Sequence, residues 1–145
     1  MLENKKQSLS LKIIYAVVLL LRPILMIYSR IKIDGFLKNK LMHEMDAFLV
    51  KFNPIFSLLL KVFLVVTVAF LIYDLFLTFK KHTFSGLTDF MLYSNAILVL
   101  TMLVLILVIP ESVINMPTIF DFCYLNILFI PILFVFKLII SKEKR

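Results

Sequence analysis

Four apolar segments, each about twenty residues long, dominate this sequence of 145 residues. They cover residues 9–28, 55–79, 90–109 and 119–140. An α-helix needs about twenty apolar residues to cross the hydrocarbon core of a bilayer. Strands of a membrane barrel would alternate apolar and polar residues, whereas these segments are apolar on all sides. The sequence therefore predicts an all-α integral membrane protein with four transmembrane helices, in a single membrane domain covering residues 1–145.

The overall composition supports lipid as the solvent. Hydrophobic residues make up 62% of the chain, against about 45–50% in a typical soluble domain. A chain this short cannot bury such an excess in a water-soluble core. The net charge of +7 does not require nucleic acid, because basic residues commonly flank membrane spans. We expect the lipid bilayer and other membrane protein subunits as partners, and no nucleic acid.

The first and third segments differ in how strongly they predict a span. Residues 90–109 contain no charged residue, whereas the first segment contains Lys12, Arg22 and Pro23. Arg22 lies close to the middle of that segment. We interpret the first segment as a retained span, and the alternative is a helix that lies in the membrane interface.

Between the first two spans, residues 36–52 have the periodicity of an amphipathic helix. Gly35 predicts a break before this helix, and Asn53-Pro54 predicts a change of chain direction after it. Such a helix, joined to spans on both sides, is expected to lie among the lipid headgroups. The alternative is a soluble helix packed on a partner protein. Its apolar face comprises Leu37, Leu41, Met45, Phe48 and Phe52.

The distribution of basic residues predicts the orientation. In the four-span topology, eight basic residues lie on the side of the termini and five on the other side. The eight are Lys5, Lys6, Lys12, Lys80, Lys81, Lys142, Lys144 and Arg145, and the five are Arg30, Lys32, Lys38, Lys40 and Lys51. We expect both termini in the cytoplasm of a bacterium, with the chain in its inner membrane; an organellar inner membrane is the alternative.

Two charged residues, Lys61 and Asp74, lie within the second span. They are thirteen residues apart, which corresponds to about 19.5 Å along a helix, so they cannot pair with each other. The fourth span offers two interhelical pairs, Asp74 with Lys137 and Lys61 with Asp121. Ionisable groups inside a membrane are candidates for functional sites.

We favour the Asp74–Lys137 pair, because each of these residues shares a helix face with a polar neighbour. Thr67 lies seven residues before Asp74, and Asn126 lies eleven residues before Lys137. Two polar stripes could then meet between spans. The functional interpretation is a relay for ions or protons, and the simpler one is a static polar seam that fixes helix packing.

No motif for catalysis, cofactor binding or metal binding is evident. His43 and Asp46 share a helix face beside Glu44, but two ligands do not hold a zinc ion. The serines have no histidine and acid at recognisable spacing. We therefore expect no enzyme, no cofactor and no metal.

The sequence leaves three function classes open. The favoured one is a small non-catalytic, multi-pass membrane subunit that packs into or stabilises a larger membrane protein complex. The second is a small ion or solute transporter or channel component. The third is an immunity-type protein that binds a pore-forming toxin in the membrane, because small four-span bacterial immunity proteins are similar in size and composition.

Overall fold

The computed structural model describes residues 2–80, 86–109 and 116–143, and the chain is helical through nearly all of these ranges. The helices are α1 (Leu2–Lys38), α2 (Met42–Phe79), α3 (Leu87–Leu105) and α4 (Met116–Glu143). Each helix contains a stretch long and apolar enough to cross a membrane. The prediction of an all-helical chain with four candidate membrane spans is confirmed.

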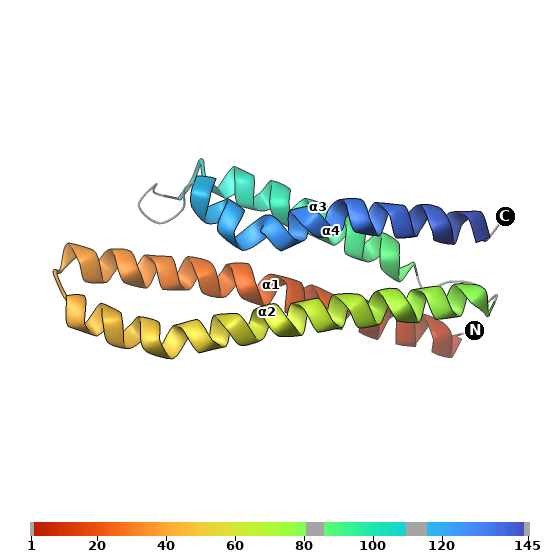
Figure 1. The fold of residues 1–145 in the computed structure, drawn as a ribbon, viewed down its shortest axis with the longest axis horizontal. Coiled ribbons are helices and arrows are strands. Elements are labelled where there is room, and N and C mark those ends of the chain that lie inside the picture. The colour runs from red at the N-terminus through yellow and green to blue at the C-terminus, as the bar shows by residue number, and fades with distance from the viewer. Residues whose placement is uncertain (1, 81–85, 110–115, 144–145) are drawn as a thin grey trace.

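The four helices form two pairs that lie side by side (Figure 1). Helix α1 packs mainly along α2, and α3 packs mainly along α4. The amino and carboxyl termini lie at the same end of the bundle. This arrangement places α3, the shortest helix, against both long helices and α4.

The helices differ greatly in length. Helices α1 and α2 contain 37 and 38 residues, which corresponds to about 55 Å each. Helix α3 contains 19 residues, about 28 Å. As a result, the turn between α1 and α2 lies well beyond the ends of α3 and α4 (Figure 1). We call residues 29–52 the projecting hairpin.

The predicted separate amphipathic helix, residues 36–52, is not formed. Helix α1 continues through Gly35 to Lys38, and α2 begins at Met42. The break falls instead at Lys40, whose φ of 56° is left-handed. The side chain of Asn39 stabilises this turn by donating a hydrogen bond from Nδ2 to the carbonyl oxygen of Gly35, 3.0 Å away.

Pro54 does not redirect the chain, because it lies inside α2. A proline in a helix removes one backbone donor and strains the preceding turn. Aromatic packing on both sides of Pro54 opposes that effect. Phe52 contacts the rings of Phe48 and Phe56 within α2, and Tyr28 of α1 contacts Phe48 and Phe52. Residues 42–52 therefore continue the axis of α2.

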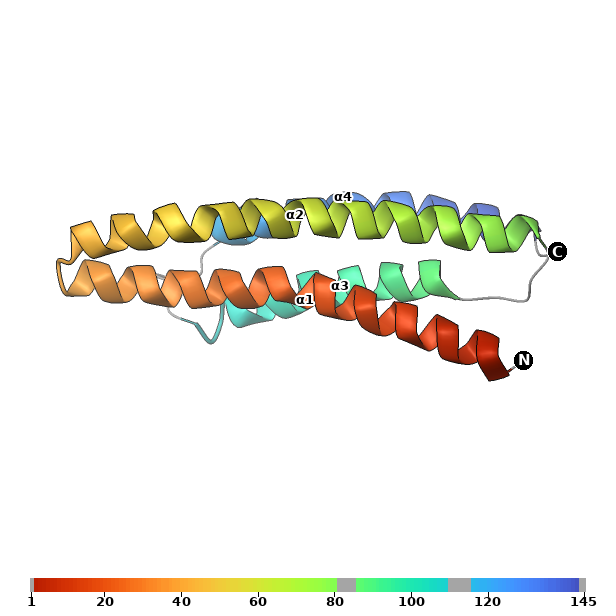
Figure 2. The same cartoon turned by 90° about the horizontal axis from the view of Figure 1, so that it is seen from below.

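Helix α1 also contains a proline, Pro23. Figure 2 shows α1 bending in its amino-terminal half, so that its first turns diverge from α2. A proline ring clashes with the carbonyl four residues earlier, so a bend just before Pro23 is expected. The bend lets α1 contact α3 as well as α2.

The core of the bundle is built around the ring of Tyr15, which is fully buried. Phe63 and Phe70 of α2 and Phe90 of α3 pack around this ring, with centroids 6.1–6.5 Å away. Phe63 also contacts Phe129 of α4 edge to face. Aromatic rings from all four helices therefore meet at one level of the bundle.

Candidate functional site

A chain of neutral polar side chains crosses the centre of the bundle. Asn95, near the middle of α3, donates from Nδ2 to the Tyr15 hydroxyl of α1 at 2.7 Å and to the carbonyl oxygen of Met91 at 2.7 Å. Asn126 of α4 donates from Nδ2 to Asn95 Oδ1 at 2.8 Å. Asn95 and Tyr15 are fully buried, and Asn126 nearly so. Three helices are thus joined by hydrogen bonds deep inside the apolar region.

Helix α2 contributes Thr67 at the same level. Its side chain is fully buried and lies beside the Tyr15 hydroxyl. The Thr67 hydroxyl donates to the carbonyl oxygen of Phe63 at 2.7 Å. Two of the predicted intramembrane contact residues, Thr67 and Asn126, therefore lie in one polar layer, together with Tyr15 and Asn95. We call these four residues the central polar layer.

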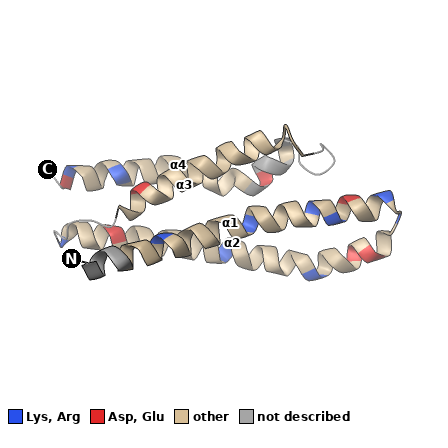
Figure 3. Ribbon diagram, turned by 180° about the vertical axis from the view of Figure 1, so that it is seen from behind, with Lys and Arg blue, Asp and Glu red and all other residues tan. Residues whose placement is uncertain are grey.

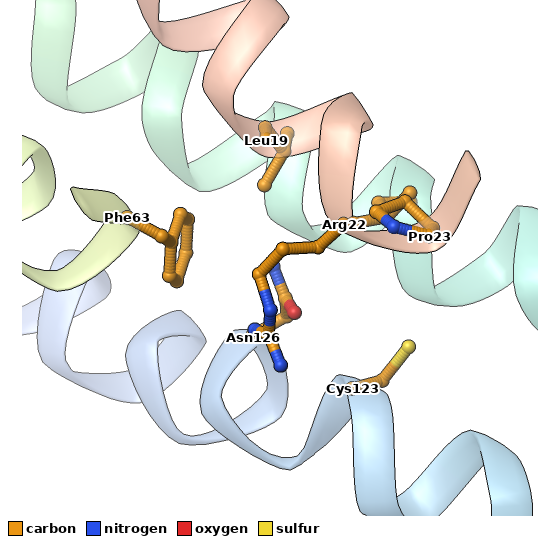
Figure 4. Close-up of a pocket in the computed structure, with 7 residues that line it drawn as sticks. Leu19, Arg22, Pro23, Phe63, Cys123 and Asn126 are labelled. Carbon is orange, nitrogen blue, oxygen red and sulfur yellow. The ribbon is translucent and has the colours of Figure 1, made fainter. Parts of the chain in front are cut away.

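Arg22 lies close to this layer, in the interior of the bundle. Its side chain is only 7% exposed, and it lines a small cavity with Asn126, Cys123 and Phe63 (Figure 4). Leu19 and Pro23 of α1 and Leu98 of α3 also line it. The Nε atom of Arg22 is enclosed and has no hydrogen-bond partner among the described residues.

A second polar cluster lies where α3 begins. Asp74 of α2 accepts two hydrogen bonds at Oδ2 from Thr88, one from the backbone nitrogen at 2.9 Å and one from the hydroxyl at 2.6 Å. The carboxylate therefore satisfies a backbone donor in the first turn of α3, where negative charge is favoured. Asp74 is 5% exposed, so this contact ties α2 firmly to α3.

The ion pair in this cluster differs from the one that we favoured. Lys137 Nζ lies 3.0 Å from Asp89 Oδ1 and 3.1 Å from the Tyr93 hydroxyl. Asp74 and Lys137 line the same cavity of about 140 Å³, but Lys137 forms its ion pair with Asp89. The prediction of an Asp74–Lys137 pair is wrong because two residues at the start of α3 take their places: Thr88 binds Asp74, and Asp89 binds Lys137.

Lys61 and Asp121 do not form the other predicted pair. Both are exposed on the surface of the bundle, and the two ion pairs between described residues are Lys137–Asp89 and Lys38–Asp34. Lys61 has a stem long enough to carry its ammonium group toward the headgroups.

The predicted interfacial face is divided by the turn between α1 and α2. Phe48 and Phe52 pack against α1, and Met45 is partly buried. Leu37 and Leu41, beside the turn, are exposed. Over part of residues 36–52, the apolar periodicity therefore results from packing between α1 and α2.

Sequence reasoning missed several residues of both polar clusters. Asn95 and Tyr15 lie in apolar runs and have no charge to mark them. In the sequence, Arg22 indicates only that the first span is weak. Its position near mid-span was the signal that could have identified it, because a charge at that depth needs a protein environment.

These clusters can fix helix positions and can hold a small polar species. Among the described residues, no three histidine, cysteine, aspartate or glutamate side chains lie close enough together to hold a metal ion. The central polar layer has hydroxyl and amide groups only, and the single charge near it belongs to Arg22. Comparison of the chain with protein families, curated proteins and solved structures finds no match.

Proposed function

We propose that this chain is a non-catalytic, multi-pass membrane subunit that packs into or stabilises a larger membrane protein complex. In this proposal the projecting hairpin, residues 29–52, is the element that docks on another subunit. The observation that carries the proposal is the extension of this hairpin beyond α3 and α4 (Figure 1).

Tilting cannot bring the hairpin into the hydrocarbon core. Helix α3 is about as long as that core is thick, and all four helices run roughly along one axis (Figures 1 and 2). A tilt large enough to submerge α1 and α2 would tilt α3 and α4 equally. The hairpin also carries five basic and three acidic residues, and Figure 3 shows the positions of charged residues along its ribbon. These features support a position in the headgroup region and beyond it.

Apolar side chains remain exposed on the hairpin despite that position. Ile31, Leu37, Met42 and Val50 are each exposed by 46–75%. Inside the bilayer, lipid covers such side chains, but outside it, exposed apolar clusters mark surfaces that another protein or the membrane covers. A partner subunit would cover this surface, and the interfacial placement that the sequence predicted would cover only its membrane-facing side.

Photo-crosslinking at matched positions tests this proposal. A photoreactive amino acid replaces Val50, which lies on the hairpin, or Val65, which lies within the span and is similarly exposed at 67%. In native membranes we expect position 50 to give one discrete protein adduct, with a much lower yield of it at position 65. Equal yields at both positions would place the interface within the bilayer. A lone monomer after mild-detergent purification, with no adduct at position 50, would contradict the proposal.

We also propose that the chain lies in a bacterial inner membrane with both termini in the cytoplasm. The larger number of basic residues on the side of the termini supports this orientation. A green fluorescent protein fused to the carboxyl terminus is expected to be fluorescent, because it folds poorly after export. A fluorescent fusion inserted at Lys40, at the tip of the hairpin, is expected to be dark. The reverse pattern would invert the topology.

A second candidate function is a small ion or solute carrier. The observation that favours it is the central polar layer with Arg22 beside it, since ionisable groups inside a membrane often mark transport pathways. Its test is flux through liposomes that contain the purified chain. Measurable flux that Asn95→Leu abolishes would favour the carrier, and flux equal to that of empty liposomes would exclude it.

A further inference from the structure

Arg22 is the charged group that the bundle buries at the greatest distance from its ends. Seven residues, or about 10.5 Å along α1, separate it from Tyr15, and its cavity lies at the level of Phe63, Leu98 and Asn126. A guanidinium stays charged in proteins. Burying it away from water costs several kcal/mol unless an opposite charge compensates it. This position therefore requires a counter-charge.

The neighbouring helices provide no described counter-charge. Helix α3 contains no charged residue from Phe90 to Leu105, and Lys61 on α2 has the same sign as Arg22. Asp121 on α4 is exposed, and neither ion pair between described residues involves Arg22. The polar groups that line the cavity with Arg22, on Asn126 and Cys123, are neutral in their ordinary states.

The shape of the cavity restricts what can supply the missing charge. The cavity has a volume of about 10 Å³. This is room for a single water or an ion of similar size. A phosphate, a carboxylate ligand or a lipid headgroup is too large. The enclosed Nε–H of Arg22 has no acceptor among the residues that the structure describes, and the Asn126 amide lies on the same wall (Figure 4). A water would accept the hydrogen bond but would leave the charge uncompensated.

We infer that the cavity beside Arg22 binds one small monovalent anion of the size of chloride. Arg22 supplies the charge and a donor from Nε, and the apolar side chains of Leu19, Phe63 and Leu98 exclude competing water. The anion neutralises a cation that the bundle buries, and so it stabilises the folded bundle. This inference does not depend on the proposed function, since a subunit and a carrier alike need Arg22 compensated.

Thermal unfolding in chloride and in gluconate tests the inference, because gluconate is too large for the cavity. The purified full chain in lipid nanodiscs is heated at matched ionic strength and followed by circular dichroism. A ligand that binds the folded state alone raises the unfolding midpoint as its concentration rises. We expect a saturable increase of about 3 °C in chloride. Equal midpoints in the two salts at every concentration would overturn the inference and would indicate water in the cavity.

Three variants locate the effect. Arg22→Gln is expected to lose the difference between the salts, and Lys61→Gln, which removes an exposed cation of α2, is expected to keep it. Cys123→Asp places a carboxylate on the cavity wall, so its unfolding midpoint is expected to become independent of chloride. The inference fails if Arg22→Gln still responds to chloride. If Arg22→Gln does not fold, a chloride response in Cys123→Asp overturns the inference just as clearly.

The single cysteine provides a second readout in the unmodified chain. Cys123 is buried and lines the cavity. An anion held there is expected to slow the reaction of the thiol with a small maleimide in chloride relative to gluconate. Lys61→Gln is expected to show the same slowing, and a rate that is equal in both salts would contradict the inference.

Discussion

The centre of the bundle and the end where its termini lie satisfy their buried polar groups by different chemistry. At the centre, Tyr15, Asn95 and Asn126 exchange hydrogen bonds between neutral groups. At the end, Asp74 caps the first turn of α3, and Lys137 pairs with Asp89. Depth explains why the central polar layer uses neutral groups, because a charge costs more at the middle of a bilayer than near its surface. Arg22, beside this layer, is the exception, and the inferred anion compensates it.

The two regions also differ in how they hold the helices. The central layer joins α1, α3 and α4 through one amide, Asn95, so that losing it disconnects three helices together. At the end, each charged group is held separately by residues of α3, Asp74 by Thr88 and Lys137 by Asp89 and Tyr93. This comparison predicts that damage to the centre has larger consequences than damage to the end.

The largest effect is expected from Asn95→Leu. The substitution removes the hydrogen bonds that Asn95 makes to the Tyr15 hydroxyl and to the Asn126 amide in a fully buried position. We expect a loss of about 2–3 kcal/mol in the free energy of unfolding, measured by reversible unfolding in mixed micelles. Ser94→Ala is the control, because among the described residues the Ser94 hydroxyl donates to the carbonyl oxygen of Phe90 in its own helix. A loss of unfolding free energy no larger than that of Ser94→Ala would contradict the prediction that damage to the centre has the larger consequences.

A smaller effect is expected from Asp74→Asn. The amide oxygen can still accept from Thr88, but the bond is no longer assisted by a negative charge. We expect a loss of about 1–2 kcal/mol in the same assay. Thr78→Ala on the same helix removes a bond to the carbonyl oxygen of Asp74 and serves as the control. If Asp74→Asn costs more than Asn95→Leu, the end of the bundle is the more important region.

A double-mutant cycle decides which carboxylate Lys137 engages. Lys137→Met is combined with Asp89→Asn in one cycle and with Asp74→Asn in another. We expect Lys137→Met and Asp89→Asn each to reduce the free energy of unfolding by less than Asp74→Asn does. We expect the Lys137→Met/Asp89→Asn double variant to lose less than the sum of its two single losses. Lys137→Met with Asp74→Asn is expected to be nearer to additive. Stronger coupling to Asp74 would restore the pair that the sequence favoured.

The smallest effect is expected on the projecting hairpin. Asp34 and Lys38 form an ion pair of 2.7 Å one helical turn apart, and the Lys38 side chain is 71% exposed. We expect Asp34→Asn to cost about 0.3–0.5 kcal/mol, with the loss decreasing as salt is added. A loss as large as that of Asp74→Asn would show that the hairpin and the bundle unfold as one tightly coupled unit.

The four helices were predictable because lipid leaves an apolar segment few alternatives. Residues 90–109 contain no charge and had to satisfy their backbone groups internally, and α3 (Leu87–Leu105) occupies most of that segment. The same logic applies to the other three segments. The four helices can therefore be predicted from composition alone, without knowing which residues contact one another between helices.

The ends of the helices were less predictable because local signals compete with packing. Gly35 and Pro54 favour breaks in isolation, but both lie inside helices whose neighbouring turns are packed against each other. The actual turn lies at Lys40, a residue type with no preference for the left-handed conformation. The position of this break depends on contacts between α1 and α2 that periodicity does not reveal.

The polar clusters were predictable in part. Thr67, Asp74, Asn126 and Lys137 are all polar groups within spans, and the sequence singled them out. Their partners depend on how α3 lies against α2 and α4, and residue spacing within one helix contains no information on that. The Asp74–Lys137 pair assumed direct contact between α2 and α4, whereas Asp89 of α3 is the partner of Lys137.

The short turn between α1 and α2 has a consequence for biosynthesis. Only residues 39–41 separate the two helices, so neither can enter the bilayer far ahead of the other. The two spans are therefore expected to insert as one helical hairpin, with the charged residues of its tip crossing the hydrocarbon in a single event. In the proposed orientation that event carries five basic residues across the membrane, so insertion of this pair is expected to be the most costly step in the assembly of the chain.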